Sequence, residues 1–361
     1  MTSTPQKPNA VVFGADIPRC VKDFIALPKR LYSAHERTQD SDTEYALLHG
    51  THILSRYFSV APILVYRGGA AVSRAVVAVY PDDSSAYLGF FESENDAEAA
   101  ALLFRTAERI SKEKGCSEIT GPVDCSFWIK YRLKLDRFGA PYTGEPYNKD
   151  YYAALWEQCG FKVCCGYSSN KYKIVDSDEG CEKYTTRLAE KLNEGYEIKS
   201  PTDGSFNNAL EEVYSLMIEL YSDFPTYKRI TKSEFCSMFK SLKSIVNYNM
   251  VRLAYYKGKA VGFFVSVPNY GNLICGKLTP IRLARILAEK RKPRSYVMLY
   301  MGVDGEHRGL GKALAEDIRS ELKRLQVPSV GALIRDGNIN KNYMENIKDF
   351  EYRYVLFKKN I

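Results

Sequence analysis

The segment Met301–Leu314, MGVDGEHRGLGKAL, joins a β-rich run to a helix through a tight, glycine-containing turn. The helix carries one apolar stripe, because aliphatic side chains recur at spacings of four, four, four and three: Leu310, Leu314, Ile318, Leu322 and Leu325. Strand-like runs precede the turn (SYVMLYMGV) and follow the helix (SVGALI). The stripe therefore needs a sheet to pack against, and the segment predicts an α/β fold with a mixed sheet.

The same order of elements occurs twice along the chain. In each half, helical segments precede a β-hairpin, a strand, an amphipathic helix and a further strand. The hairpin glycines Gly69 and Gly258 lie 189 residues apart, as do Phe161 and Phe350, which each follow a predicted helix. The shared offset indicates a weak duplication of architecture. The first helix, near Cys20, is expected to be interrupted at Pro28.

The chain has 361 residues, a length that suits two domains of roughly 150–200 residues. A polar stretch at 175–200 marks the predicted boundary, with one domain over 1–175 and another over 176–361. An aromatic insertion at 124–147 in the first half is expected either to line an acceptor pocket between the domains or to pack as a loop.

Composition limits the cellular compartments and the classes of ligand that are expected. Hydrophobic residues make up 45% and charged residues 26%, as in an ordinary folded protein. No apolar run reaches the roughly 18–20 residues that span a bilayer, and the N-terminus lacks a secretory pattern, so a cytoplasmic protein is expected. Nine cysteines without a CxxC pair and four histidines offer no zinc ligand set, so no metal is expected. The net charge of +8 suits an anionic small molecule and lacks the motif context of nucleic-acid binding.

The glycine turn has the properties of an anion site. The first backbone N–H groups of a helix lack intrahelical acceptors, and together with the helix dipole they attract phosphate groups. Gly309 and Gly311 leave room for a phosphate to approach the backbone. The segment is not a Walker loop or a dinucleotide fingerprint, because both GxxxxGK[ST] and GxGxxG are absent.

Residues 308–313, RGLGKA, fit the pattern [QR]-x-x-G-x-[GA], which is similar to the pyrophosphate loop of the GNAT (GCN5-related N-acetyltransferase) superfamily. The order of elements in both halves resembles two tandem GNAT-like acyl-CoA N-acyltransferase domains. The second half carries the loop. The first half resembles a degenerate unit, because its corresponding helix start carries Glu94, Asp96 and Glu98, which would repel a pyrophosphate.

The resemblance implies direct acyl transfer from acetyl-CoA or a longer acyl-CoA to a primary amine of a small molecule. It places the pyrophosphate on a loop whose members are Arg308, Gly309, Leu310, Gly311, Lys312 and Ala313. The strand backbone at Met301 and Val303 would align the pantetheine arm. Tyr343 is the candidate proton donor to the thiolate. Asn338 would contact the pantetheine or a water, or would serve only as a helix cap.

Two alternatives remain at this point. Tandem GNAT chains also resemble Fem-type transferases, which take an amino acid from aminoacyl-tRNA, although such enzymes should not need an intact RxxGxG. The second alternative is a non-catalytic acyl-CoA-binding or scaffold protein. The amine, the acyl chain length, the general base and the oligomeric state are not readable from the sequence.

Overall fold

The computed structural model describes residues 6–337 and 343–361. One sheet of 13 strands runs through the whole molecule in the order β1-β2-β3-β4-β5-β13-β7-β12-β11-β10-β9-β8, with β6 beside β13. Parallel and antiparallel pairs both occur, since β4–β5 and β11–β12 are parallel and the other pairs are antiparallel. The predicted α/β fold with a mixed sheet is therefore confirmed.

The first half supplies ten of the helices and strands that build this sheet and its cover. They are β1 (Asn9–Val12), α1 (Pro18–Leu31), α2 (Ser41–Leu48), β2 (Ser59–Arg67), β3 (Ala70–Val79), β4 (Ser85–Ser93), α3 (Ala97–Glu113), β5 (Glu118–Gly121), α4 (Tyr152–Gln158) and β7 (Lys162–Tyr172). A short 3₁₀ turn, η1 (Ser55–Tyr57), and the two-residue strand β6 (Leu133–Lys134) complete this half.

The second half repeats the order. Its elements are β8 (Tyr196–Lys199), α6 (Phe206–Leu220), α7 (Lys232–Phe239), β9 (Val251–Tyr256), β10 (Lys259–Pro268), β11 (Tyr296–Val303), α9 (Leu310–Leu325), β12 (Ser329–Arg335) and β13 (Lys348–Asn360). Helix α5 (Glu182–Asn193) lies before the repeat and α8 (Pro280–Arg291) is inserted after β10. In the part of the chain that the structure describes, this half also contains the 3₁₀ turns η2 (Lys240–Ser244), η3 (Tyr248–Met250) and η5 (Glu345–Ile347).

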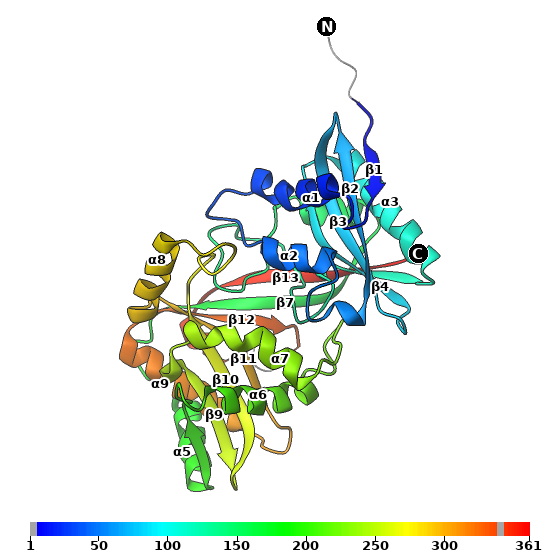
Figure 1. Ribbon diagram of the computed structural model, residues 1–361. Helices are drawn as coiled ribbons and strands as arrows, with labels where there is room; N and C mark the ends of the chain where they lie inside the picture. Colours follow the sequence, from blue (N-terminus) through cyan, green and yellow to red (C-terminus); the bar gives the residue numbers. More distant parts are fainter. Residues whose placement is uncertain (1–5, 338–342) are drawn as a thin grey trace.

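The closing strands of the two halves are exchanged. Strand β13, from the second half, pairs with β5 of the first, and β7, from the first half, pairs with β12 of the second. The two exchanged strands also pair with each other over most of their length, and Figure 1 shows them side by side between the halves. The sheet is thus continuous across position 175, and the division of the chain into domains 1–175 and 176–361 stays a prediction.

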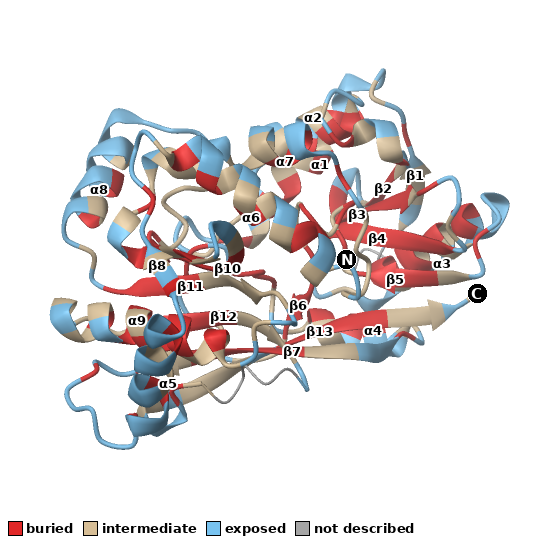
Figure 2. Cartoon of the chain, turned by 90° about the horizontal axis from the view of Figure 1, so that it is seen from below, coloured by how far each residue is buried: buried red, intermediate tan, exposed pale blue. Residues whose placement is uncertain are grey.

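Helices cover both faces of the sheet. Helices α1, α2, α6 and α7 belong to one apolar cluster, which also contains the aromatic insertion. Helices α3 and α4 pack on the opposite face of the first half, and α9 packs on that face of the second. Figure 2 shows buried residues concentrated in the strands, whereas α5 and α8 present mostly exposed or half-buried residues. No helix in the described ranges is both long and apolar enough to cross a membrane.

Local signals in the sequence explain several boundaries. Both predicted hairpins form, and their glycines Gly69 and Gly258 have φ values of 80° and 78°. Asp96 caps α3 by accepting from the Ala99 amide. The expected interruption of the first helix at Pro28 is wrong. The amide that proline lacks would have donated to the carbonyl of Phe24, and this carbonyl instead accepts from the Arg74 guanidinium at 2.7 Å.

Candidate active site

The turn before α9 has the shape that a phosphate-binding loop needs. Gly309 is the N-cap of α9 and adopts φ 84°, a left-handed conformation that favours glycine. A Cβ added to Gly309 would lie 2.9 Å from Cδ of Arg187, and one added to Gly311 would lie 2.9 Å from the hydroxyl of Tyr343. Leu310 is fully buried and ties the turn to the core. The two glycines therefore keep the backbone accessible in a crowded place.

The turn leaves part of its backbone available to a ligand. Three amides donate to carbonyl oxygens inside the turn, over 3.1 to 3.4 Å: those of Leu310, Lys312 and Ala313. In this segment, which the structure describes in full, the amides of Arg308, Gly309 and Gly311 have no backbone acceptor. These amides and the positive end of the helix dipole favour an anion at this point.

Strand β11 opens beside the loop. It pairs with β12 only from Tyr296 to Met298 and then separates from it, while its other edge stays bonded to β10 up to Val303. Strand β12 continues to pair with β7 up to Arg335, with an irregular register between Gly331 and Ile334. One backbone edge of β11 is consequently without a strand partner from residue 299 to 303. The carbonyl of Met301 accepts from the Tyr221 hydroxyl at 3.2 Å.

A cavity of about 800 Å³ joins the loop, the open edge of β11 and the aromatic insertion. The predicted site residues that line it are Met301, Val303, Arg308, Gly309, Gly311, Lys312 and Tyr343. Leu310 and Ala313 lie behind them, with no exposed surface. Asn338 falls outside the described residues, so its predicted role is not placed. The structure thus brings the described part of the predicted site to one cavity.

The first half forms the opposite wall of this cavity through the segment from Phe127 to Arg132. Trp128 holds this segment in place, since its indole nitrogen donates to the carbonyl of Lys228 at 2.6 Å and its ring contacts Phe235 of α7. Both expectations for the aromatic insertion are met in part, because it packs in the apolar cluster and also lines this cavity, while its role toward an acceptor stays a prediction.

An apolar crevice leads away from the cavity between α6, α7 and the strands β9 and β10. Met217, Phe239 and Tyr300 line both spaces, so the two are adjacent. The crevice has a volume of about 50 Å³ and an almost entirely apolar lining. That volume holds roughly three to five water-sized groups, which suits a few methylenes better than a polar ligand.

Tyr343 lies in a turn that precedes η5. The sequence predicts a helix from residue 338, and the first residues of that helix lie outside the described part of the chain. The hydroxyl of Tyr343 borders Gly311, at the phosphate end of the cavity, and its ring contacts that of Tyr184 edge-on, with centroids 6.0 Å apart. Burial, reinforced by Tyr184, raises the pKa of Tyr343 to about 12, so the phenol keeps its proton at neutral pH. Its role as proton donor stays a prediction.

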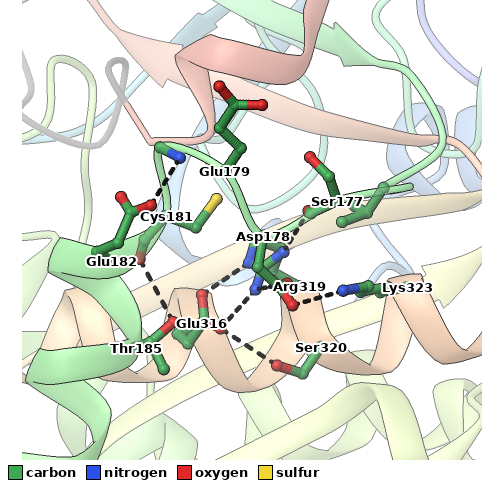
Figure 3. Close-up of polar contacts among 12 residues, drawn as sticks. Ser177, Asp178, Glu179, Cys181, Glu182, Thr185, Glu316, Arg319, Ser320 and Lys323 are labelled. Atoms are coloured by element: carbon green, nitrogen blue, oxygen red, sulfur yellow. Dashed lines mark hydrogen bonds and ion pairs between the residues drawn. The ribbon is translucent and has the colours of Figure 1, made fainter.

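Sequence reasoning missed Arg187, a half-exposed cation that lines the cavity from α5. The polar stretch 175–200 was interpreted as a boundary, and no periodic signal within it pointed to the loop. A polar network, shown in Figure 3, fixes α5 and the preceding segment to α9. In it the buried Arg319 binds Glu316 at 2.7 Å and Asp178 at 2.8 Å, and Thr185 of α5 donates to Glu316 at 3.3 Å. The network therefore positions Arg187 over the start of the same helix.

Comparisons with known proteins were made for the whole chain. No family model matches it. It is 23% identical over 299 residues to the bacterial ceramide synthase of Caulobacter vibrioides, covering 75% of this chain and 73% of that protein. It is 24% identical over 290 residues to protein YghO of Escherichia coli, covering 76% of this chain and 74% of that protein.

Solved structures match over nearly the full length. A tandem GNAT protein from the clavulanic acid biosynthesis pathway superposes with a TM-score of 0.53 at 13% identity, covering 98% of both chains. A probable N-acyltransferase from Enterococcus faecalis superposes with a TM-score of 0.51 at 8% identity, covering 99% of this chain and 73% of that one. The duplicated order of elements, the glycine turn before α9 and these superpositions agree: the chain has the tandem GNAT fold, the fold of acyl-CoA N-acyltransferases.

Proposed function

We propose that this protein is an acyl-CoA-dependent N-acyltransferase that moves an acyl group from a coenzyme A thioester to a primary amine of a small molecule. The observation that carries the proposal is the N-terminal end of α9. The amides of residues 308, 309 and 311 have no backbone acceptor there. They lie at the same end of the cavity as the side chains of Arg308, Lys312 and Arg187. This arrangement supports a pyrophosphate there, with the pantetheine arm along the open edge of β11.

The reaction needs few protein groups. The acceptor ammonium loses a proton, its nitrogen attacks the thioester carbonyl carbon, the C–S bond breaks, and the departing thiolate takes up a proton. Tyr343 is the proposed donor of that last proton. Backbone N–H groups of β11 near residues 301 to 303 are the proposed partners of the pantetheine arm and of the carbonyl oxygen. Asn338 remains a proposed pantetheine contact or helix cap.

The apolar crevice favours an acyl group longer than acetyl. It leaves the cavity beside Tyr300, on the open strand along which the pantetheine arm is proposed to run, and its lining offers nothing polar to bind. A ceramide is an amide of a fatty acid, and one relative bears the name ceramide synthase, which is consistent with an acyl donor longer than acetyl. Acetyl-CoA, which the resemblance alone allows, is therefore the weaker of the two proposed donors.

The first half is proposed not to bind coenzyme A. At the corresponding helix start, Asp96 caps α3 and forms an ion pair with Arg67 at 2.8 Å, and Arg67 also contacts Glu98. The positive end of that helix is thus already neutralised by the protein's own carboxylates.

A thermal-shift titration with coenzyme A, acetyl-CoA, octanoyl-CoA and palmitoyl-CoA tests the proposal. A ligand that binds only the folded state stabilises it by about 2.7 kcal/mol at a hundredfold excess over Kd. Wild type is compared with Arg308→Glu and with Arg291→Glu, which makes the same charge change on an exposed position of α8. We expect shifts in wild type and Arg291→Glu and a much smaller shift in Arg308→Glu, and equal shifts in all three would refute the site.

A second assay, which measures amide formation and free-thiol release after an amine is added to the protein and acyl-CoA, separates the alternatives. A Fem-type enzyme would use aminoacyl-tRNA and form no amide from acyl-CoA and amines. A scaffold protein would show the shift with acyl-CoA but release no free thiol when amines are added.

A further inference from the structure

A second cavity, of about 230 Å³, lies in the first half of the molecule. It is enclosed by residues 38 to 44, strands β3 and β4, and the segment that follows β5. Its lining includes charged side chains of both signs: Asp40, Glu44, Arg74, Glu92, Asp124, Lys130 and Arg132. Arg74, Glu44 and Glu92 are at most 5% exposed. Burial of so much charge is costly unless each group has a partner, so their partners show what the cavity leaves for a ligand.

Most of these groups are satisfied within the protein. Arg74 forms a bidentate pair with Glu44, at 2.7 and 2.8 Å. Glu92 accepts from three side chains over 2.7 to 2.8 Å: Tyr32, Gln39 and Tyr152. The carboxylates of Glu44 and Glu92 are therefore held by partners within the protein.

Three polar atoms around the cavity remain without a partner among the described residues. Asp124 uses one carboxylate oxygen to accept from the Phe90 amide at 2.6 Å, and no hydrogen bond is formed by the other. The amide oxygen of Gln39 and Nε of Arg74 are buried and have no hydrogen-bond partner. The Arg74 side chain is fully buried. A buried donor, a buried acceptor and a carboxylate oxygen together call for a ligand with polar groups of its own.

The second cavity meets the coenzyme cavity at one wall. Ile129, Lys130, Tyr131 and Arg132 line both. The coenzyme cavity is also lined by residues 299 to 303 of β11, so this wall separates the second cavity from the space beside that strand. A ligand in the second cavity thus lies next to the part of β11 where the proposed pantetheine arm ends.

We propose that the second cavity binds the acyl acceptor, and that this acceptor is a primary amine that also carries hydroxyl groups. Its ammonium group binds the free carboxylate oxygen of Asp124, and its hydroxyl groups donate to Gln39 and accept from Arg74. The proposal rests on the proposed acyltransferase function, for which it names the second substrate. Each partner matches in kind: a carboxylate for a cation, a carbonyl oxygen for an O–H donor and a guanidinium N–H for an oxygen.

The test uses the full-length protein and 2-amino-1,3-propanediol as the probe, with its N-acetyl derivative as the matched uncharged compound. Binding is measured by saturation-transfer NMR titration with and without bound coenzyme A. The variants are Asp124→Asn, which keeps the acceptor for the Phe90 amide but loses the charge, and Glu98→Gln, which removes an exposed carboxylate outside the cavity. Gln39→Met is a second cavity variant that does not depend on how Asp124→Asn folds.

We expect the probe to bind wild type and Glu98→Gln equally, and to bind Asp124→Asn and Gln39→Met at least tenfold more weakly. The N-acetyl derivative should bind wild type at least tenfold more weakly than the amine. Unchanged binding in Asp124→Asn, or no binding of the probe to wild type, overturns the proposal. The thermal shift with coenzyme A distinguishes failure of this proposal from failure of the proposed function. A shift with coenzyme A but no amine binding contradicts only the acceptor site. No shift with coenzyme A in wild type contradicts the acyltransferase function itself.

Discussion

Arg187 of α5 crosses the start of α9 so closely that a Cβ on Gly309 would stand 2.9 Å from its Cδ and 3.1 Å from its Nε. The guanidinium therefore borders the unpaired amide of Gly309, where an anion is proposed to bind. The contact links the segment between the two halves to the coenzyme loop.

Substitution of Arg187 should weaken coenzyme binding. Because its side chain is 40% exposed and also pairs with Glu190, we expect Arg187→Glu to raise the Kd for coenzyme A about tenfold, or ~1.4 kcal/mol. Lys183→Glu, on an exposed position of the same helix, is the control and should leave Kd within twofold. Calorimetric titration measures both, and equal effects of the two substitutions would assign the change to net charge alone.

Tyr343→Phe should separate two roles for this tyrosine. As the proton donor it should lower kcat by roughly 10²–10⁴ and change the KM for acyl-CoA little. Its hydroxyl borders Gly311, so a phosphate contact would raise KM and leave kcat unchanged instead. Steady-state kinetics with thiol release as the readout distinguishes them. Tyr184→Phe removes the hydroxyl of the neighbouring tyrosine but keeps the ring that contacts Tyr343, so it should change neither kcat nor KM.

Filling the apolar crevice should shorten the preferred acyl chain. Val213 of α6 lines the crevice but not the coenzyme cavity, so Val213→Phe should lower kcat/KM for octanoyl-CoA at least tenfold and spare acetyl-CoA. Val72→Phe, at a buried site of the first half, controls for general damage to the core. An equal fall for both acyl-CoAs in Val213→Phe would contradict an acyl-binding role for the crevice.

Amine binding should depend on pH through Asp124. Burial raises the pKa of this carboxyl and Glu44 reinforces the rise, while Lys130, Arg74 and the Phe90 amide partly oppose it. Binding of an ammonium needs the ionised form, so affinity should be complete above the raised pKa and fall as pH drops through it. Titrations with 2-amino-1,3-propanediol should show this loss in wild type and a flat profile in Asp124→Asn. A profile that persists in the variant would assign the titration to another group.

Much of the fold was predictable because its signals are local. The apolar stripe of α9, the glycine hairpins and the cap of α3 each follow from a few neighbouring residues, and the tandem GNAT fold that they indicated is confirmed. The glycine turn before α9 was recognisable for the same reason, and its role in coenzyme binding stays a proposal.

Strand β7 could not be recognised from its sequence. Its residues Ser168, Ser169 and Asn170 are at most 1% exposed, although their composition is typical of a loop. They are buried because β7 lies at the centre of the sheet between β12 and β13, and the pairing depends on partners more than 150 residues away. Asp124 and Gln39 could not be recognised as possible site residues for a related reason, because the cavity that both line exists only after the sheet has formed.

The exchange of β7 and β13 has a consequence for biosynthesis. One edge of β5 pairs with β13, which leaves the ribosome long after β5. Strand β7 likewise has no partner on either edge until β12 and β13 have been synthesised. Until then the nascent chain exposes open strand edges that invite pairing with other chains. A chaperone that shields these edges during translation should therefore raise the yield of native protein more than the stability of the finished fold alone would suggest.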